Sequence, residues 1–135
     1  MAPISVLLVD DNVTFLHILI DFLREEEDIL VVGTARSGEE ALARVNELQP
    51  QVILLDLAMP GLGGFKTIPR LRNVTPGVGI IVLTVLDTNG YCEAALAAGA
   101  DDFVAKANLN TDLIPAIQRL IQGRRSIGGT PPTPA

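Results

Sequence analysis

The feature of this sequence that most constrains its fold is an alternation, repeated five times, of a short apolar run with a longer segment of helical period. The apolar runs are too short for helices and rich in β-branched and aliphatic residues, so they predict strands. They lie at positions 5–9, 29–34, 52–55, 79–83 and 102–105. Three of them are apolar at successive positions, which is typical of parallel strands that are covered on both faces.

Helical segments are predicted between these runs, and several carry recognisable start signals. Asn12 can cap the first helix, and Ser37 followed by Glu40 has the form of a capping box. Pro69 and Pro115 fall near the end of the first turn of their helices, where the missing N–H costs little. The predicted helices cover positions 13–25, 38–48, 64–72, 90–98 and 111–122.

The five strand and helix pairs predict an α/β fold with a parallel sheet. Right-handed crossovers between parallel strands give a three-layer doubly wound sandwich, and we expect the flavodoxin-like (βα)5 arrangement with strand order 2-1-3-4-5. A chain of 135 residues is the length of one domain. We assign that domain to residues 1–122, and we expect residues 123–135, which are rich in Gly and Pro, to form a flexible tail.

Composition excludes several classes of function. Ten basic and sixteen acidic residues give a net charge of −6 without a basic stripe, so direct nucleic-acid binding by this chain is not expected. No apolar run approaches the roughly 18 residues that suggest a membrane span. The single cysteine, Cys92, cannot pair within the chain, which favours a reducing compartment such as the cytoplasm.

Polar side chains follow four of the predicted strands. Asp10 and Asp11 come after the first strand, Asp56 after the third, Thr84 after the fourth and Lys106 after the fifth. The carboxyl ends of parallel strands share one edge of a sheet, where ligands of such folds bind. Three carboxylates there would repel one another unless a cation lay between them, and Mg²⁺ (or Mn²⁺) prefers such oxygen ligands. The pattern therefore predicts a metal site at which a carboxylate can attack phosphorus.

Four stretches of sequence together resemble the response-regulator receiver family over roughly positions 4–122. They are VLLVDDN at 6–12, VILLDLAMPGLGGF at 52–65, IIVLTV at 80–85 and GADDFVAK at 99–106. The run from 82 to 122 is most similar to the nitrate-regulator-like subgroup. Members of that subgroup usually carry a C-terminal helix-turn-helix DNA-binding output domain, which is absent from this chain.

The resemblance implies a role for each acidic residue of the strand ends. Asp56 would be the phosphoacceptor, and Asp11 and Asp56 would bind the metal together with the backbone carbonyl of Ala58. Asp10 would hold a water on the metal. The same resemblance implies that Thr84 and Lys106 contact the phosphoryl group.

The resemblance also implies what the chain does. It would be a phosphoacceptor switch of a two-component system that takes its phosphoryl group from a sensor histidine kinase or a small phosphodonor. Phe103 would be the aromatic residue that changes rotamer on activation, altering the surface used for partner binding or for a homodimer. Such a domain regulates transcription through its output and catalyses only its own phosphorylation and dephosphorylation.

This sequence departs from the common pattern of the family at several positions. Val85 stands where many receivers have Ala or Ser, so we expect it to narrow access to the phosphoacceptor. Ala58 and Leu86 cannot orient an attacking water, and we therefore predict a long-lived phosphoryl group. Lys106 is followed by Ala107 rather than Pro, and a cis bond there would cost about 2.5 to 4 kcal/mol. We expect a trans bond.

Three other functions fit parts of the pattern. A haloacid-dehalogenase-like phosphatase also uses Asp, Thr and Lys at strand ends, but it requires a second aspartate where this chain has Ala58. A flavodoxin-like cofactor binder would need a Ser-, Thr- or Gly-rich loop after the first strand, where the acidic pair stands. A receiver that signals through protein contacts without phosphate stays open.

Overall fold

The predicted sheet is present, with the predicted strand order. The structure is a computed structural model that describes residues 3–59, 63–85 and 89–129. Its strands pair in parallel in the order β2-β1-β3-β4-β5, which confirms the doubly wound arrangement. The strands are β1 (Ile4–Val9), β2 (Ile29–Ala35), β3 (Val52–Asp56), β4 (Gly79–Thr84) and β5 (Asp102–Ala105).

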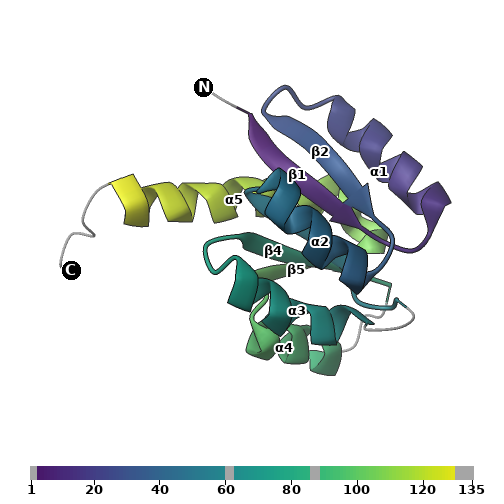
Figure 1. The fold of residues 1–135 in the computed structure, drawn as a ribbon. Helices are drawn as coiled ribbons and strands as arrows, with labels where there is room; N and C mark the ends of the chain where they lie inside the picture. Colours follow the sequence, from purple (N-terminus) through teal and green to yellow (C-terminus); the bar gives the residue numbers. More distant parts are fainter. Residues whose placement is uncertain (1–2, 60–62, 86–88, 130–135) are drawn as a thin grey trace.

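Helices cover both faces of this sheet, as Figure 1 shows. They are α1 (Val13–Arg24), α2 (Gly38–Leu48), α3 (Gly63–Val74), α4 (Asn89–Ala98), α5 (Leu109–Gly129) and the short 3-10 helix η1 (Lys106–Asn108). Helices α1 and α5 pack on one face, and α2, α3 and α4 pack on the other. The three layers of the predicted sandwich are therefore confirmed.

The alternation of side chains along each strand explains why two cores form. In β1, Val6 and Leu8 point toward α1 and α5, whereas Leu7 and Val9 point toward α2 and α3. All four are buried. Burying a side chain of this size contributes about 1.5 to 3 kcal/mol, so a central strand that is apolar at every position stabilises both layers at once.

The predicted start signals of the first two helices are formed. The Asn12 side chain accepts a hydrogen bond from the N–H of Phe15 at 3.0 Å, and the Ser37 hydroxyl accepts one from the N–H of Glu40 at 3.1 Å. The carboxylate of Glu40 reaches back to the N–H of Arg36, one residue before the cap, at 2.7 Å. Both helices therefore begin within four residues of the end of the preceding strand.

The positions of the two helical prolines differ from the prediction. Helices α3 and α5 begin one and two residues earlier than expected, so Pro69 and Pro115 are each the seventh residue of the helix and lie in its second turn. There a proline removes one helical hydrogen bond. Both prolines are exposed to solvent.

The predicted end of the last helix is wrong as well. Helix α5 continues to Gly129 rather than ending at residue 122, and it extends past the sheet in Figure 1. The apolar period of the sequence stops at Ile121, and a Gln, a Gly and two Arg follow it. A helix already formed extends by its own backbone hydrogen bonds. Residues 130–135 of the predicted tail lie outside the described residues.

Among the described helices, none combines the length and the apolar character that crossing a lipid bilayer requires.

Candidate functional site

The carboxyl-end edge of the sheet holds most of the buried polar side chains. Four polar or charged residues are buried in the described part of the chain, and three of them, Asp10, Asp56 and Thr84, lie at the ends of β1, β3 and β4. The fourth, Thr67, satisfies itself within α3 by donating to the carbonyl of Gly63 at 2.5 Å. Buried polarity at one edge of an otherwise apolar sheet marks that edge as the place of chemistry.

The three predicted acids come together. Oxygens of Asp10, Asp11 and Asp56 all lie within 4.8 Å of one another. With one ammonium in contact, that of Lys106, the formal charge of the group is −3 + 1 = −2 when all are ionised. A divalent cation would neutralise it.

The acid cluster also has nearly the right size for magnesium. Mg²⁺ binds oxygen at about 2.1 Å, so two opposite ligands lie about 4.2 Å apart. The spread of 4.8 Å is slightly larger, so side-chain movements of less than about one ångström, or a water between one acid and the ion, would complete the shell. The donor set, carboxylates with open positions, is the one magnesium prefers.

Lys106, which is far from Asp10 in the sequence, lies beside the three acids. Its Nζ lies 2.7 Å from Oδ2 of Asp10 and 3.5 Å from Oδ1 of Asp56, and its side chain is only 14% exposed. The fifth strand delivers it, since η1 begins at Lys106 directly after β5 ends. The predicted juxtaposition of three acids and one ammonium is therefore present.

Asp10 and Asp56 differ in how they are held. Asp10 uses both oxygens within the protein: Oδ1 accepts the N–H of Asn12 at 2.9 Å, and Oδ2 pairs with Lys106. The contacts of Asp56 with the N–H of Ala58, at 3.3 Å, and with Lys106 both fall on Oδ1. Both oxygens of Asp10 are thus held by the protein, whereas the contacts of Asp56 fall on one of its oxygens.

The ionisation of Asp56 follows from its surroundings. Burial raises the pKa of its carboxyl from 3.8 to about 6, opposed by the nearby Lys106 ammonium and reinforced by the Asp10 charge. The N–H of Ala58 pulls the pKa slightly down. A carboxylate that is destabilised when charged gains from any cation placed beside it.

A glycine packs against the backbone at the end of β3, the strand that carries Asp56. Gly64, near the start of α3, donates its N–H to the carbonyl of Leu57 at 3.2 Å. A Cβ at Gly64 would come within 2.5 Å of the Leu57 Cα and 2.7 Å of the Asp56 carbonyl oxygen, and neither backbone atom can move aside cheaply. Sequence reasoning read this glycine only as the beginning of a helix and missed its contact with the site.

Phe15 is a second residue that sequence reasoning missed. It lies in the first turn of α1, and the Nζ of Lys106 sits 4.0 Å from the centre of its ring. In the sequence, Phe15 shares its helical spacing with the apolar residues Leu19 and Phe22, and such spacing gives no sign of a charge above the ring. Its closeness to Asp10 and Asp11 in the sequence was the one signal available.

Three of the remaining residues with predicted roles are exposed. Phe103, on β5, is 41% exposed, and Val85, directly after Thr84, is 69% exposed. Ala58 is exposed on the loop after β3. The peptide bond between Lys106 and Ala107 is trans, as predicted. Leu86, which the sequence linked to hydrolysis of the phosphoryl group, lies outside the described residues.

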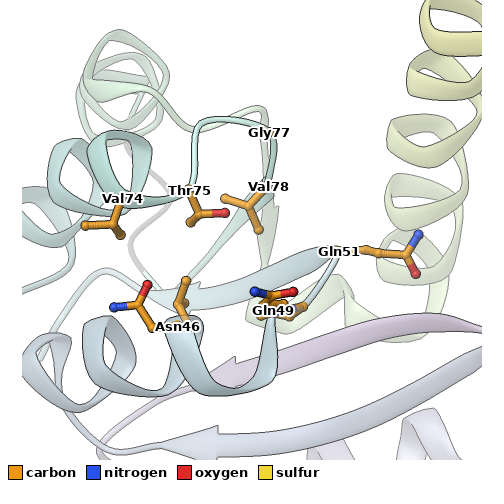
Figure 2. Close-up of a pocket in the computed structure, with 9 residues that line it drawn as sticks. Asn46, Gln49, Gln51, Val74, Thr75, Gly77 and Val78 are labelled. Carbon is orange, nitrogen blue, oxygen red and sulfur yellow. The ribbon is translucent and has the colours of Figure 1, made fainter.

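A separate hollow of about 340 Å³ lies at the opposite end of the sheet, where β3 and β4 begin. Figure 2 shows the side chains of Asn46 and Gln49 from one side of it and those of Thr75 and Val78 from the other. No charged residue is among the described residues that line it. It therefore offers no group for the chemistry of the acidic edge.

Comparison with known proteins agrees with this geometry. The family described as "Response regulator receiver domain" matches residues 6–118. The chain is 33% identical to the response regulator GacA of Pseudomonas protegens over 92% of this chain and 58% of that protein. It is 43% identical to a protein-glutamate methylesterase/protein-glutamine glutaminase of Symbiobacterium thermophilum over 77% of this chain and 29% of that protein. The chain thus spans little more than half the length of one relative and less than a third of the other.

Solved structures show the same likeness. The isolated receiver domain of RcsB from Salmonella enterica serovar Typhimurium, with the phosphomimetic BeF3−, superposes with a TM-score of 0.83 at 27% identity, covering 90% of each chain. The receiver domain of NarL from Mycobacterium tuberculosis gives a TM-score of 0.85 at 27% identity, covering 92% of this chain and all of that one. These likenesses agree with the nitrate-regulator-like subgroup that the sequence indicated. The chain belongs to the response regulator receiver domain family.

Proposed function

We propose that this chain accepts a phosphoryl group on Asp56 in a magnesium-dependent reaction and thereby switches a signalling surface. The observation that carries the proposal is the acid cluster with its single ammonium: three carboxylates within 4.8 Å and Lys106 between two of them. The formal charge of this group is −2 when all four side chains are ionised, and a divalent cation would neutralise it. The phosphoryl donor would be a sensor histidine kinase or a small phosphodonor.

The proposed transfer is a single displacement at phosphorus. A carboxylate oxygen of Asp56 forms the new O–P bond, the bond from phosphorus to the donor's nitrogen or oxygen breaks, and the leaving group keeps the electron pair and takes up a proton. Little else is required of the protein than positioning and neutralisation of charge. The contacts on Oδ1 of Asp56 support Oδ2 as the attacking oxygen.

The other residues have supporting roles in this proposal. Asp11 and Asp56, with the carbonyl of Ala58, would hold Mg²⁺, which would draw charge from the phosphoryl oxygens when bound. Asp10, fixed on both of its oxygens, is better suited to hold a water of the ion than to bind it directly. Lys106 would turn from Asp56 to a phosphoryl oxygen.

Output would follow from Thr84 and Phe103. Thr84 is buried at the end of β4, so its hydroxyl can meet a phosphoryl group on Asp56. We propose that this draws Thr84 inward and lets the exposed Phe103 turn into the space behind it, which shifts an equilibrium between two surface arrangements. The large exposed apolar residues Tyr91 and Leu96 of α4 lie on the helix beside β5 and would belong to the responding surface, which would bind a partner or a second copy.

The wider context is also proposed. The chain's likeness to the RcsB response regulator of Salmonella typhimurium, whose structure is described in terms of DNA interaction, favours a transcription regulator with a DNA-binding output domain outside this chain, which itself would not contact nucleic acid. We place the reaction in the cytoplasm, where the lone Cys92 stays reduced and histidine kinases deliver their phosphoryl groups. The domain would act on itself and on no other substrate.

The test is the intact mass of the protein after incubation with a small phosphodonor and Mg²⁺. We expect the wild type to gain the mass of one phosphoryl group, and Asp56→Asn or a sample with excess chelator to gain none. A gain that persists in Asp56→Asn would overturn the assignment. The same measurement over time tests the predicted long lifetime, which a half-life of seconds would contradict.

A further inference from the structure

The ammonium of Lys106 is enclosed by groups of two kinds. The carboxylates of Asp10 and Asp56 lie 2.7 and 3.5 Å from its Nζ. The ring of Phe15 also lies close to Nζ, with its centre at 4.0 Å. The ring is itself anchored, because Phe15 packs against the core cluster beneath α1.

An aromatic face attracts a cation without taking one of its hydrogen-bond directions. The attraction comes from the negative face of the ring and grows when the pair is shielded from water. The Lys106 side chain is 14% exposed, so this contact is largely shielded. Phe15 can therefore hold the ammonium in place while leaving its N–H groups free to change acceptor.

This property matters because Lys106 must change partners during the proposed reaction. Before transfer its ammonium pairs with Asp10 and Asp56. During transfer it has to meet an oxygen of the phosphoryl group that arrives at Asp56. A side chain held only by carboxylates would have to break those contacts to do so, whereas the ring stays in contact throughout.

We infer that Phe15 is a positioning residue for phosphoryl transfer, acting through Lys106. This inference rests on the proposed function and extends it to a residue of α1. If this is so, the rate of phosphorylation should depend on the charge distribution of the Phe15 ring as well as on its size.

The experiment compares chains with different side chains at position 15. Phe15→Tyr keeps the aromatic face, Phe15→Leu removes it, and site-specific trifluorophenylalanine keeps the shape but weakens the negative face. The matched control places trifluorophenylalanine at Phe22, which packs against the same core cluster two turns along α1. The maximal rate constant of phosphorylation and the half-saturating donor concentration are measured with Mg²⁺, together with the unfolding temperature.

We expect Phe15→Leu to lower the maximal rate constant by about tenfold, with the fluorinated chain in between and Phe15→Tyr near the wild type. The half-saturating concentration should stay the same, because holding the ammonium in place affects the phosphoryl oxygens during transfer and not the binding of the donor. Fluorination at Phe22 should leave the rate unchanged. If Phe15→Leu does not fold, the fluorinated chain still decides.

Two results would contradict the inference in different ways. A fluorinated Phe15 chain that reacts as fast as the wild type would show that the ring only fills space, and the proposed function would stand. A wild type that takes up no phosphoryl group would overturn the proposed function and, with it, the role of Phe15.

Discussion

The two edges of the sheet differ in how their polar groups are paired. At the amino-end edge, Ser5 and Gln51 tie β1 to β3 through neutral hydrogen bonds of 3.0 Å in both directions, and the carbonyl of Gln51 accepts the N–H of Gly79 at 2.9 Å. At the carboxyl-end edge, Asp10 and Asp56 are buried as acids with a single ammonium between them. The hydrogen bonds of the first edge are made within the protein, whereas the second edge keeps a surplus of negative charge that a cation from outside would neutralise.

This difference indicates that the fold is less stable than it could be at the carboxyl-end edge of the sheet. Neutral hydrogen bonds near solvent contribute modestly and reliably. Buried charges are stabilising only when each is fully paired, and removing one partner is strongly unfavourable. Local departures from the most stable arrangement are expected at functional sites, and here they gather at one edge only.

The largest expected effect comes from removing the ammonium. Lys106→Met leaves Asp10 and Asp56 without their buried cation, and breaking such a pair costs about 4 kcal/mol. We expect a loss of this size in the free energy of unfolding at pH 7, measured by urea denaturation without metal, and slow phosphorylation. Lys66→Met, at an exposed position of α3, is the control. Equal free energies of unfolding for Lys106→Met and Lys66→Met would show that the buried acids do not depend on the ammonium, and the two edges would then not differ in this respect.

The next effect concerns the ionisation of Asp56. Its pKa is raised from 3.8 to about 6 in the folded protein, so the folded state holds this proton more tightly than the unfolded state. The resulting stabilisation is complete below pH 3.8 and is lost as the pH rises through about 6. At pH 7 without metal the charged carboxyl then costs about 3 kcal/mol.

Asp56→Asn should therefore raise the free energy of unfolding at pH 7 by up to about 3 kcal/mol. It should also flatten the dependence of stability on pH between about 4 and 6. Denaturation in urea across this range, without metal, provides the measurement. A variant that follows the wild-type pH profile would show that Asp56 is not destabilised by burial.

Magnesium should reverse part of this cost. An ion that binds only the folded state stabilises it by about 2.7 kcal/mol at a concentration one hundred times its Kd. We expect this gain in the wild type and its loss in Asp11→Ala, measured as the shift of the urea midpoint on adding Mg²⁺. Asp112→Ala, which removes an exposed carboxylate of α5, should keep the full response. A response of Asp11→Ala equal to that of the wild type would place the ion elsewhere.

The smallest effect is expected at the amino-end edge. Gln51→Ala removes the side-chain oxygen that accepts the N–H of Ser5, a loss of about 1 kcal/mol. Phosphorylation should proceed at the wild-type rate, because this edge lies at the other end of the strands. The two quantities are read from urea denaturation and from the intact-mass time course. A slowed reaction would mean that the edges are coupled.

Most of the fold could be predicted from the sequence because its signals are local. Apolar runs at successive positions identify covered parallel strands, and the caps at Asn12 and Ser37 identify helix starts. The end of α5 could not be predicted, since the apolar period stops at Ile121 while the backbone stays helical to Gly129. Periodicity reports packing and is silent where a helix leaves the core.

The sequence was enough to predict which residues form the acidic edge, but it was not enough to predict all the contacts around them. Strand ends placed Asp10, Asp56 and Lys106 at one edge, and the structure brings them together. The ring of Phe15 over the ammonium and the close approach of Gly64 to the loop after β3 depend on how helices sit on the sheet. That arrangement is set by tertiary packing, which no spacing of residues records.

The central claim is that the acidic edge directs phosphoryl transfer to one carboxylate. It is tested most directly by treating the phosphorylated protein with borohydride, which reduces an acyl phosphate to an alcohol, and mapping the peptides by mass spectrometry. The account predicts homoserine at position 56 only when both Mg²⁺ and the phosphodonor were present. Homoserine at Asp10 or Asp11, or a phosphoryl group that resists reduction because it sits on a hydroxyl such as that of Thr84, would contradict it.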